Sequence, residues 1–142
     1  MPGDLSEIDT VVFSALNTDP ALLALLPDGV FWDVAPGASK FVLLSRSDGE
    51  HANALGGDGW LRVTYTAKAV IASASVVAAN DAAFRIHELL HWGLQDVTAG
   101  NYLIMHVERV LPIRYTEVDA QNTAARWQHH GGQYSVMVSP IN

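Results

Sequence analysis

Residues 60–72, WLRVTYTAKAVIA, alternate between two kinds of side chain along their whole length. One side of an extended chain would carry Leu61, Val63, Tyr65, Ala67, Ala69 and Ile71, and the other Trp60, Arg62, Thr64, Thr66, Lys68 and Val70. Successive side chains of a strand point to opposite faces of its sheet, so the segment predicts a strand with one face buried and one largely in water. Such a strand favours an antiparallel-rich sheet that helices cover on one face only.

Helical periodicity appears near the N-terminus and in the middle of the chain. Apolar residues recur at steps of three and four in residues 5–16, where Asp4 or Ser6 is the expected cap. Asp19 followed by Pro20 predicts a short second helix, which ends at the Pro-Asp-Gly of residues 27–29. Residues 75–92 are rich in alanine and lack glycine and proline, and their apolar side chains gather on one side, which predicts the main helix.

Four more segments have strand composition: residues 30–34, 40–46, 101–118 and 131–140. Pro112 predicts a sheet edge or a bulge within the third of these. Residues 47–59 hold four glycines and no apolar period, which predicts a long, mobile loop, and residues 119–130 resemble an irregular connection. The order is helix, three strands, helix, two strands. We therefore expect a single α+β domain over residues 1–142, with a mixed, mainly antiparallel sheet of four to five strands and two main helices on one face.

Composition limits the classes of function. Hydrophobic residues make up 49% of the 142 residues and charged residues 16%, so part of the apolar surface is expected to contact other subunits. A net charge of −7 argues against a sequence-independent grip on nucleic acid. The chain has no cysteine, which excludes thiol chemistry. Acidic residues near the N-terminus and the lack of an apolar run of membrane-spanning length predict a soluble, unexported protein without a membrane partner.

The motif His87-Glu88-Leu89-Leu90-His91 fits the zinc-protease pattern H-E-x-x-H. A hydrolase of that kind needs a third ligand, yet Gly93 comes two residues after His91, and Gln95 and Asp96 follow where a further ligand is expected. The helical projection also places both histidines on the flank of the apolar stripe rather than in a cleft. We therefore favour two polar residues on a partly exposed helix flank, with no catalytic residue, metal or cofactor, and keep a zinc-dependent hydrolase as a remote alternative.

Other candidate sites give weaker signals. The pair His129-His130 before two glycines is read as an exposed lead-in to a strand rather than a metal site. The glycine run of residues 56–59 lacks the lysine of a phosphate-binding loop. Trp32, Trp60, Trp92 and Trp127 are expected to complete the core more often than an interface. Val77 and Phe84 lie outside the apolar stripe of the main helix, so they are the better interface candidates.

Several blocks of sequence resemble one known family. They are PALLALLPDGVFWDVAPGASKFVLLSR, VTYTAKAV, the alanine-rich AANDAAFRIHELLH, HVERVLPIRYTEVD and WQHHGGQYSVMV. Together they resemble, along most of the chain, the tail terminator family of long-tailed bacteriophages, also called tail-completion or tail-to-head joining proteins, with its prophage and gene-transfer-agent relatives. The resemblance rests on the succession of these blocks along the chain.

The resemblance implies a structural virion protein at the head–tail junction, assembled in the host cytoplasm. Such a protein forms a homohexameric ring on the tail tube, ends its polymerisation and joins the head connector, while DNA passes through the lumen without specific binding. Another head–tail junction or minor tail protein of similar fold is the alternative. The expected interface comprises Val77, Phe84, His87 and His91 on the main helix, and Asp48, Glu50, His51 and Leu55 in the 47–59 segment, which could order on contact with the tube or a neighbouring subunit.

Overall fold

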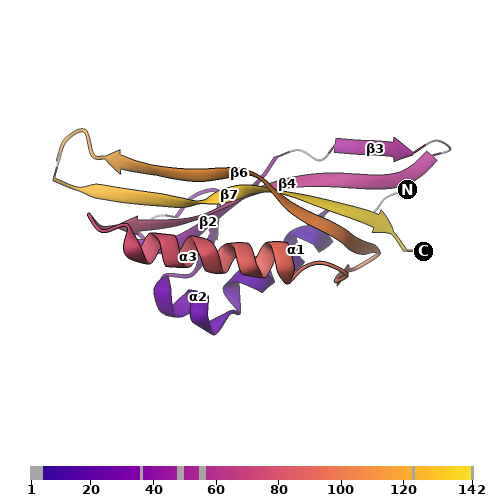
Figure 1. The fold of residues 1–142 in the computed structure, drawn as a ribbon, viewed down its shortest axis with the longest axis horizontal. Helices are drawn as coiled ribbons and strands as arrows, with labels where there is room; N and C mark the ends of the chain where they lie inside the picture. The colour runs from indigo at the N-terminus through magenta and orange to yellow at the C-terminus, as the bar shows by residue number, and fades with distance from the viewer. Residues whose placement is uncertain (1–4, 36, 48–49, 55–56, 123, 142) are drawn as a thin grey trace.

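The computed structural model describes residues 5–35, 37–47, 50–54, 57–122 and 124–141, with residues 50–54 and 57–59 described by their backbone alone (Figure 1). The helices are α1 (Ser6–Asn17), α2 (Pro20–Leu25) and α3 (Val77–His87), and α3 continues into a turn of π-helix, η1 (Glu88–Trp92). The strands are β1 (Val30–Trp32), β2 (Lys40–Arg46), β3 (Glu50–Ala54), β4 (Gly57–Ala72), β5 (Thr98–Ala99), β6 (Tyr102–Val118) and β7 (Arg126–Pro140).

Within the described residues these strands form one sheet in the order β1-β2-β4-β7-β6-β5. Strand β3 pairs with the first part of β4, on the same side of β4 as β2. The β1–β2 pair is parallel and the other pairs are antiparallel. The helices lie on one face of the sheet and leave the other face uncovered (Figure 1). The predicted class, an α+β fold with a mixed, mainly antiparallel sheet, is confirmed, with more strands than the four to five expected.

The core lies between the helices and the covered face of the sheet. The predicted inner face of β4 is buried from Leu61 to Ile71, and α1 contributes Ile8, Val12 and Leu16. The residues of α3 that reach the sheet include Ala79 and Ala82. Because an alanine side chain is a single methyl group, these positions let the α3 backbone approach β4 and β7 closely. The alanine-rich composition of this segment is therefore a packing requirement as well as a helical preference.

Two predictions about the connections are wrong, and one of the two caps expected for α1 is not found. Residues 50–54 and 57–59 belong to β3 and β4 rather than to a loop, because backbone pairing across β3 and β4 supplies regularity that the glycine-rich sequence does not signal. Residues 126–130 belong to β7, which pairs with β4 on one side and β6 on the other. The N-cap position of α1 is Leu5, which makes no capping hydrogen bond through its side chain, and Ser6 is already helical; Asp4 lies outside the described residues.

Strand β6 forms most of one edge of the sheet. Its outer side pairs with β5 only at Tyr102 and Leu103, and the last outward hydrogen bonds are made by Ile104. The β6–β7 register shifts between Arg109 and Leu111, and Pro112 follows directly. Pro112 therefore lies on an edge strand beside a bulge, as predicted. No helix in the described part of the chain is long and apolar enough to cross a membrane.

Two adjacent glycines let β7 fit closely between its neighbours. A Cβ atom on Gly131 would overlap the carbonyl oxygen of Ala67 and the backbone of Lys68 in β4. At Gly132 the nearest atoms would belong to the flexible Arg109 side chain of β6, at 2.7 Å. The first glycine is thus required by an overlap with backbone, whereas the second meets mainly a side chain that can move, with the carbonyl oxygen of Leu111 at 3.2 Å.

Candidate functional site

The HELLH segment begins in α3 and runs through η1. The backbone N–H of Gly93 donates to the carbonyl oxygen of Glu88, five residues back, at 3.0 Å. A Cβ atom on Gly93 would lie 2.5 Å from the carbonyl oxygen of Leu89, so glycine is what lets the wide turn close. His87 and His91 are half-buried, on the helix flank where the sequence placed them.

The two imidazole rings are stacked rather than aimed at a common point. Their centroids lie 4.9 Å apart with 8° between the planes. Nitrogen lone pairs lie in the plane of each ring, so two parallel stacked rings direct their nitrogens side by side and not toward one ion. His87 Nδ1 lies 3.1 Å from the buried hydroxyl of Tyr134. Burial, with Arg109 and His91 nearby, lowers the pKa of His87, which favours the neutral ring.

The remaining requirements of a zinc hydrolase fit no better. Glu88, the expected general base, forms an ion pair with Arg85 at 3.5 Å. No group of three or more His, Asp or Glu side chains that could hold a metal ion occurs among the residues that the structure describes. The donor set around HELLH therefore does not fit a catalytic zinc site.

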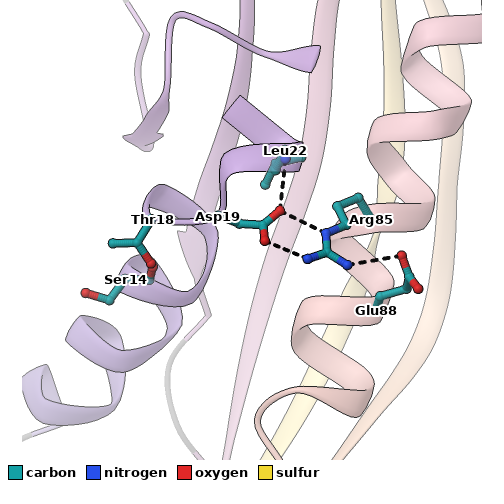
Figure 2. Close-up of polar contacts among 6 residues, drawn as sticks. All are labelled: Ser14, Thr18, Asp19, Leu22, Arg85 and Glu88. Carbon is teal, nitrogen blue, oxygen red and sulfur yellow. Dashed lines mark hydrogen bonds and ion pairs between the residues drawn. The ribbon is translucent and has the colours of Figure 1, made fainter. Parts of the chain in front are cut away.

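Arg85 instead ties the main helix to α2 (Figure 2). Its Nε and Nη2 atoms donate to the two carboxylate oxygens of Asp19 at 2.8 and 2.6 Å. The same carboxylate accepts the backbone N–H of Leu22 at 2.9 Å and so caps α2, as the Asp-Pro signal predicted. The Arg85 hydrogen bonds, above all, hold the pKa of Asp19 below its ordinary value. Arg85, two residues before the HELLH segment, thus has a structural role.

The prediction that His129 and His130 form an exposed lead-in is wrong. Both are buried within β7, and burial lowers the pKa of each. His129 stacks on Tyr115, with ring centroids 4.4 Å apart, and its Nε2 lies 2.8 Å from the Glu117 carboxylate. His130 Nδ1 lies 2.7 Å from Asn80 Oδ1 on α3. The two residues are adjacent in β7, so their rings point to opposite faces of the sheet: His129 holds β7 to β6 within the hairpin, and His130 holds the hairpin to α3.

The tryptophans divide between packing and exposure. Trp32 is half-buried against Phe13, with ring centroids 6.0 Å apart, and Trp60 and Trp127 are also half-buried. Trp92 at the end of η1 is 68% exposed, so the expectation that it completes the core is wrong. Because the π-turn shifts the helical phase, Trp92 faces solvent on the same side as Phe84.

Two surfaces combine exposed apolar side chains with charged side chains. On the main helix Val77, Phe84 and Trp92 are each more than 60% exposed, and they alternate with Asp81 and Glu88. These five residues recur at steps of three and four, and we call them the α3 stripe. The second surface, the β6 edge, comprises Arg109, Val110, Leu111, Arg114, Tyr115 and Val118, all exposed.

The sequence-predicted interface residues fall only partly on these surfaces. Val77 and Phe84 lie in the α3 stripe, whereas His87 and His91 lie beside it. Asp48 and Leu55 lie outside the described residues; Glu50 and His51 lie in β3, where the structure describes the backbone alone. Sequence reasoning missed the β6 edge. Its signal was the run of large apolar residues on both sides of Pro112, a residue already expected at an edge.

The uncovered face of the sheet carries a depression of about 510 Å³ over β4, β7 and β6. It is open to solvent and lined mainly by polar side chains, among them Arg62, Thr64, Glu108 and Gln133. The charged residues in its lining are one arginine and one glutamate, which gives no excess of charge to attract an anion or a cation. This depression is the wet face predicted by the alternation in residues 60–72.

The described features define a class: a small α+β protein whose sheet is covered by helices on one face and open on the other. A chain of the virion of a native gene transfer agent particle has this fold, with a TM-score of 0.65 and 15% sequence identity over 93% of this chain and 94% of that one. The shared fold agrees with the tail terminator resemblance of the sequence. The bacteriophage SPP1 gp17 protein is also similar, with a TM-score of 0.49 and 12% identity over 98% of this chain and 94% of that one. No protein-family model and no curated protein matches the chain.

Proposed function

We propose that this chain is a tail terminator: a structural virion protein that forms a ring on the tail tube, ends tube polymerisation and presents the surface that joins the head connector. Residues 1–142 act as one domain, and the ring is a homohexamer. The protein resides at the head–tail junction of the virion after assembly in the host cytoplasm.

The observation that carries the proposal is the match in fold to a virion chain over nearly the whole length of both proteins. An insertion or a missing element would have reduced the coverage of one chain or the other. The same assignment is supported by the succession of sequence blocks that resemble tail terminators. The two similarities are separate, since one comes from the order of motifs and the other from the path of the backbone.

The surface of the molecule also suits ring assembly. A closed ring of identical subunits uses two different surfaces on each copy, and the α3 stripe and the β6 edge are two such unlike apolar surfaces. A net charge of −7 suits a channel through which DNA passes, because cationic surfaces would hold its phosphates. We infer a structural rather than an enzymatic role because Glu88 and the histidines of HELLH have packing and ion-pair partners in the fold.

The test is the effect of the purified protein on tail assembly. Native mass spectrometry and electron microscopy are expected to show hexameric rings, alone or with the tail tube protein of the same particle. Added to growing tubes, the protein is expected to stop elongation, so that tube length falls as its concentration rises. Monomers alone at every concentration, with and without tube protein, together with unchanged tube lengths, would refute the proposal.

A further inference from the structure

The outward-facing side chains of the α3 stripe repeat along the helix. Val77, Phe84 and Trp92 follow one another at about every second turn, and Asp81 and Glu88 lie on the turns between them. From residue 77 to residue 92 the helix advances about 22 Å at 1.5 Å per residue. The stripe is therefore a narrow apolar strip with two carboxylates along its length.

The β6 edge is an extended segment that is long enough to span the stripe. From residue 109 to residue 118 a strand advances about 30 Å at 3.3 Å per residue. Its apolar members Val110, Leu111, Tyr115 and Val118 are each 47–55% exposed. From Ile104 to its C-terminal end, the outer side of β6 pairs with no other strand among the described residues. An unpaired sheet edge is commonly covered by another part of the protein, and a helix is one of the structures that do so.

The unlike surfaces carry opposite charges. The α3 stripe carries Asp81 and Glu88, and the β6 edge carries Arg109 and Arg114. The exposed Glu117 in the same stretch of β6 already has a partner within its own chain, His129 Nε2 at 2.8 Å. In a chain of net charge −7, two copies repel each other unless the contact places opposite charges together. Contact between unlike surfaces satisfies this condition, whereas stripe against stripe would oppose like charges.

We propose that the α3 stripe of one copy packs along the β6 edge of a second copy, head to tail, so that its two carboxylates face Arg109 and Arg114. This inference rests on the proposed ring and names the surfaces that close it. Each copy offers its stripe to one neighbour and its edge to the other, which is the heterologous arrangement a cyclic ring requires.

A reciprocal charge reversal tests the electrostatic part of the contact. Asp81→Arg alone and Arg114→Asp alone are each expected to weaken association at least about tenfold, because each places like charges in contact. The double variant is expected to recover most of the loss, since it restores the opposite pair in reversed order. Association is measured by sedimentation velocity over a concentration series, with and without tube protein.

A mixing experiment tests whether the surfaces are unlike. Phe84→Ser damages the stripe and Leu111→Ser damages the edge, and both residues are exposed, so each variant is expected to fold. Alone, neither forms rings; mixed, the intact edge of one meets the intact stripe of the other, and growth ends at a 1:1 heterodimer. Val34→Ser is the control, because Val34 is 70% exposed but lies outside both surfaces, and it is expected to form rings.

The outcomes separate this inference from the function on which it rests. Rings formed equally well by the Phe84, Leu111 and single charge-reversal variants would overturn the contact and leave the tail-terminator proposal standing. Loss of rings in those variants without heterodimers on mixing, or without recovery in the charge-reversed double variant, would also overturn the contact. An unaltered chain that stays monomeric with and without tube protein would overturn both.

Discussion

The Asp19–Arg85 contact allows a quantitative prediction of stability. Asp19 has a 10% exposed side chain, caps α2 through the Leu22 N–H and receives two hydrogen bonds from Arg85. Asp19→Ala removes both functions. Loss of an N-cap costs about 1 kcal/mol. We add about 1 kcal/mol for the ion pair, well below the cost of breaking a fully buried pair, because Arg85 is 33% exposed and keeps Glu88 nearby.

The expected total is a loss of about 2 kcal/mol in the free energy of unfolding, or roughly 7 °C in Tm for a domain of this size. Asp19→Asn separates the two functions, because its amide oxygen can still accept the Leu22 N–H while the charge is gone. It is expected to cost about 1 kcal/mol. The assay is urea unfolding followed by circular dichroism, with Arg85→Ala and the double variant completing a thermodynamic cycle.

The pH dependence gives a second check on the same contact. The folded pKa of Asp19 lies below its ordinary value of 3.8, so the ionised side chain stabilises the fold above that pH. This contribution is lost as pH falls through the folded pKa, and the difference between the unaltered chain and Asp19→Asn shrinks with it. Equal stabilities of the Ala and Asn variants, or a coupling energy to Arg85 below about 0.3 kcal/mol, would refute the reasoning.

Three further predictions concern the glycines and the histidines. Gly131→Ala is expected to cost about 2–3 kcal/mol by urea unfolding and Gly132→Ala at least about 1 kcal/mol less, because the first overlaps the β4 backbone, whereas the second meets the movable Arg109 side chain and only grazes the Leu111 carbonyl oxygen at 3.2 Å; equal costs would contradict the close approach of β7 to β4. Burial holds the pKa of His129 below 6.5, so the unfolded chain binds this proton first and stability falls as pH drops below about 6.5. His129→Phe should reduce that loss in unfolding curves at pH 7.5 and 5.5, and an unchanged slope would show that the ring does not contribute. His91→Ala is expected to change stability by less than about 1 kcal/mol, and elemental analysis to find no zinc that depends on His91; stoichiometric zinc lost in the variant would contradict the stacked arrangement.

Local patterns predicted the elements whose periodicity comes from burial. In residues 60–72 and 75–92 the apolar side chains repeat regularly because one side of each segment packs against the core. Both elements could therefore be predicted from the sequence. Strand β3 and the first part of β7 could not be read in this way. The former is paired through its backbone, and the latter buries Gln128, His129 and His130 between strands, where polar composition suggests a loop.

The candidate surfaces were predictable to a different extent. Val77 and Phe84 were identified because they lie outside the apolar stripe of the helix, a property that the sequence shows directly. Trp92 was not, because the π-turn beginning at Glu88 changes the helical phase that the projection assumed. The β6 edge was missed because exposure on both faces of one strand depends on the order of strands, which one sequence does not reveal.

The interruption of β6 at Pro112 has a consequence for the aggregation of the free chain. A long uncovered strand is a template on which other chains can grow in a cross-β manner. The irregular register between Arg109 and Leu111, together with a residue that has no N–H, divides this template, and only the six residues 113–118 remain after it. The unassociated chain can therefore expose apolar side chains along this edge while fibril growth on its backbone is hindered.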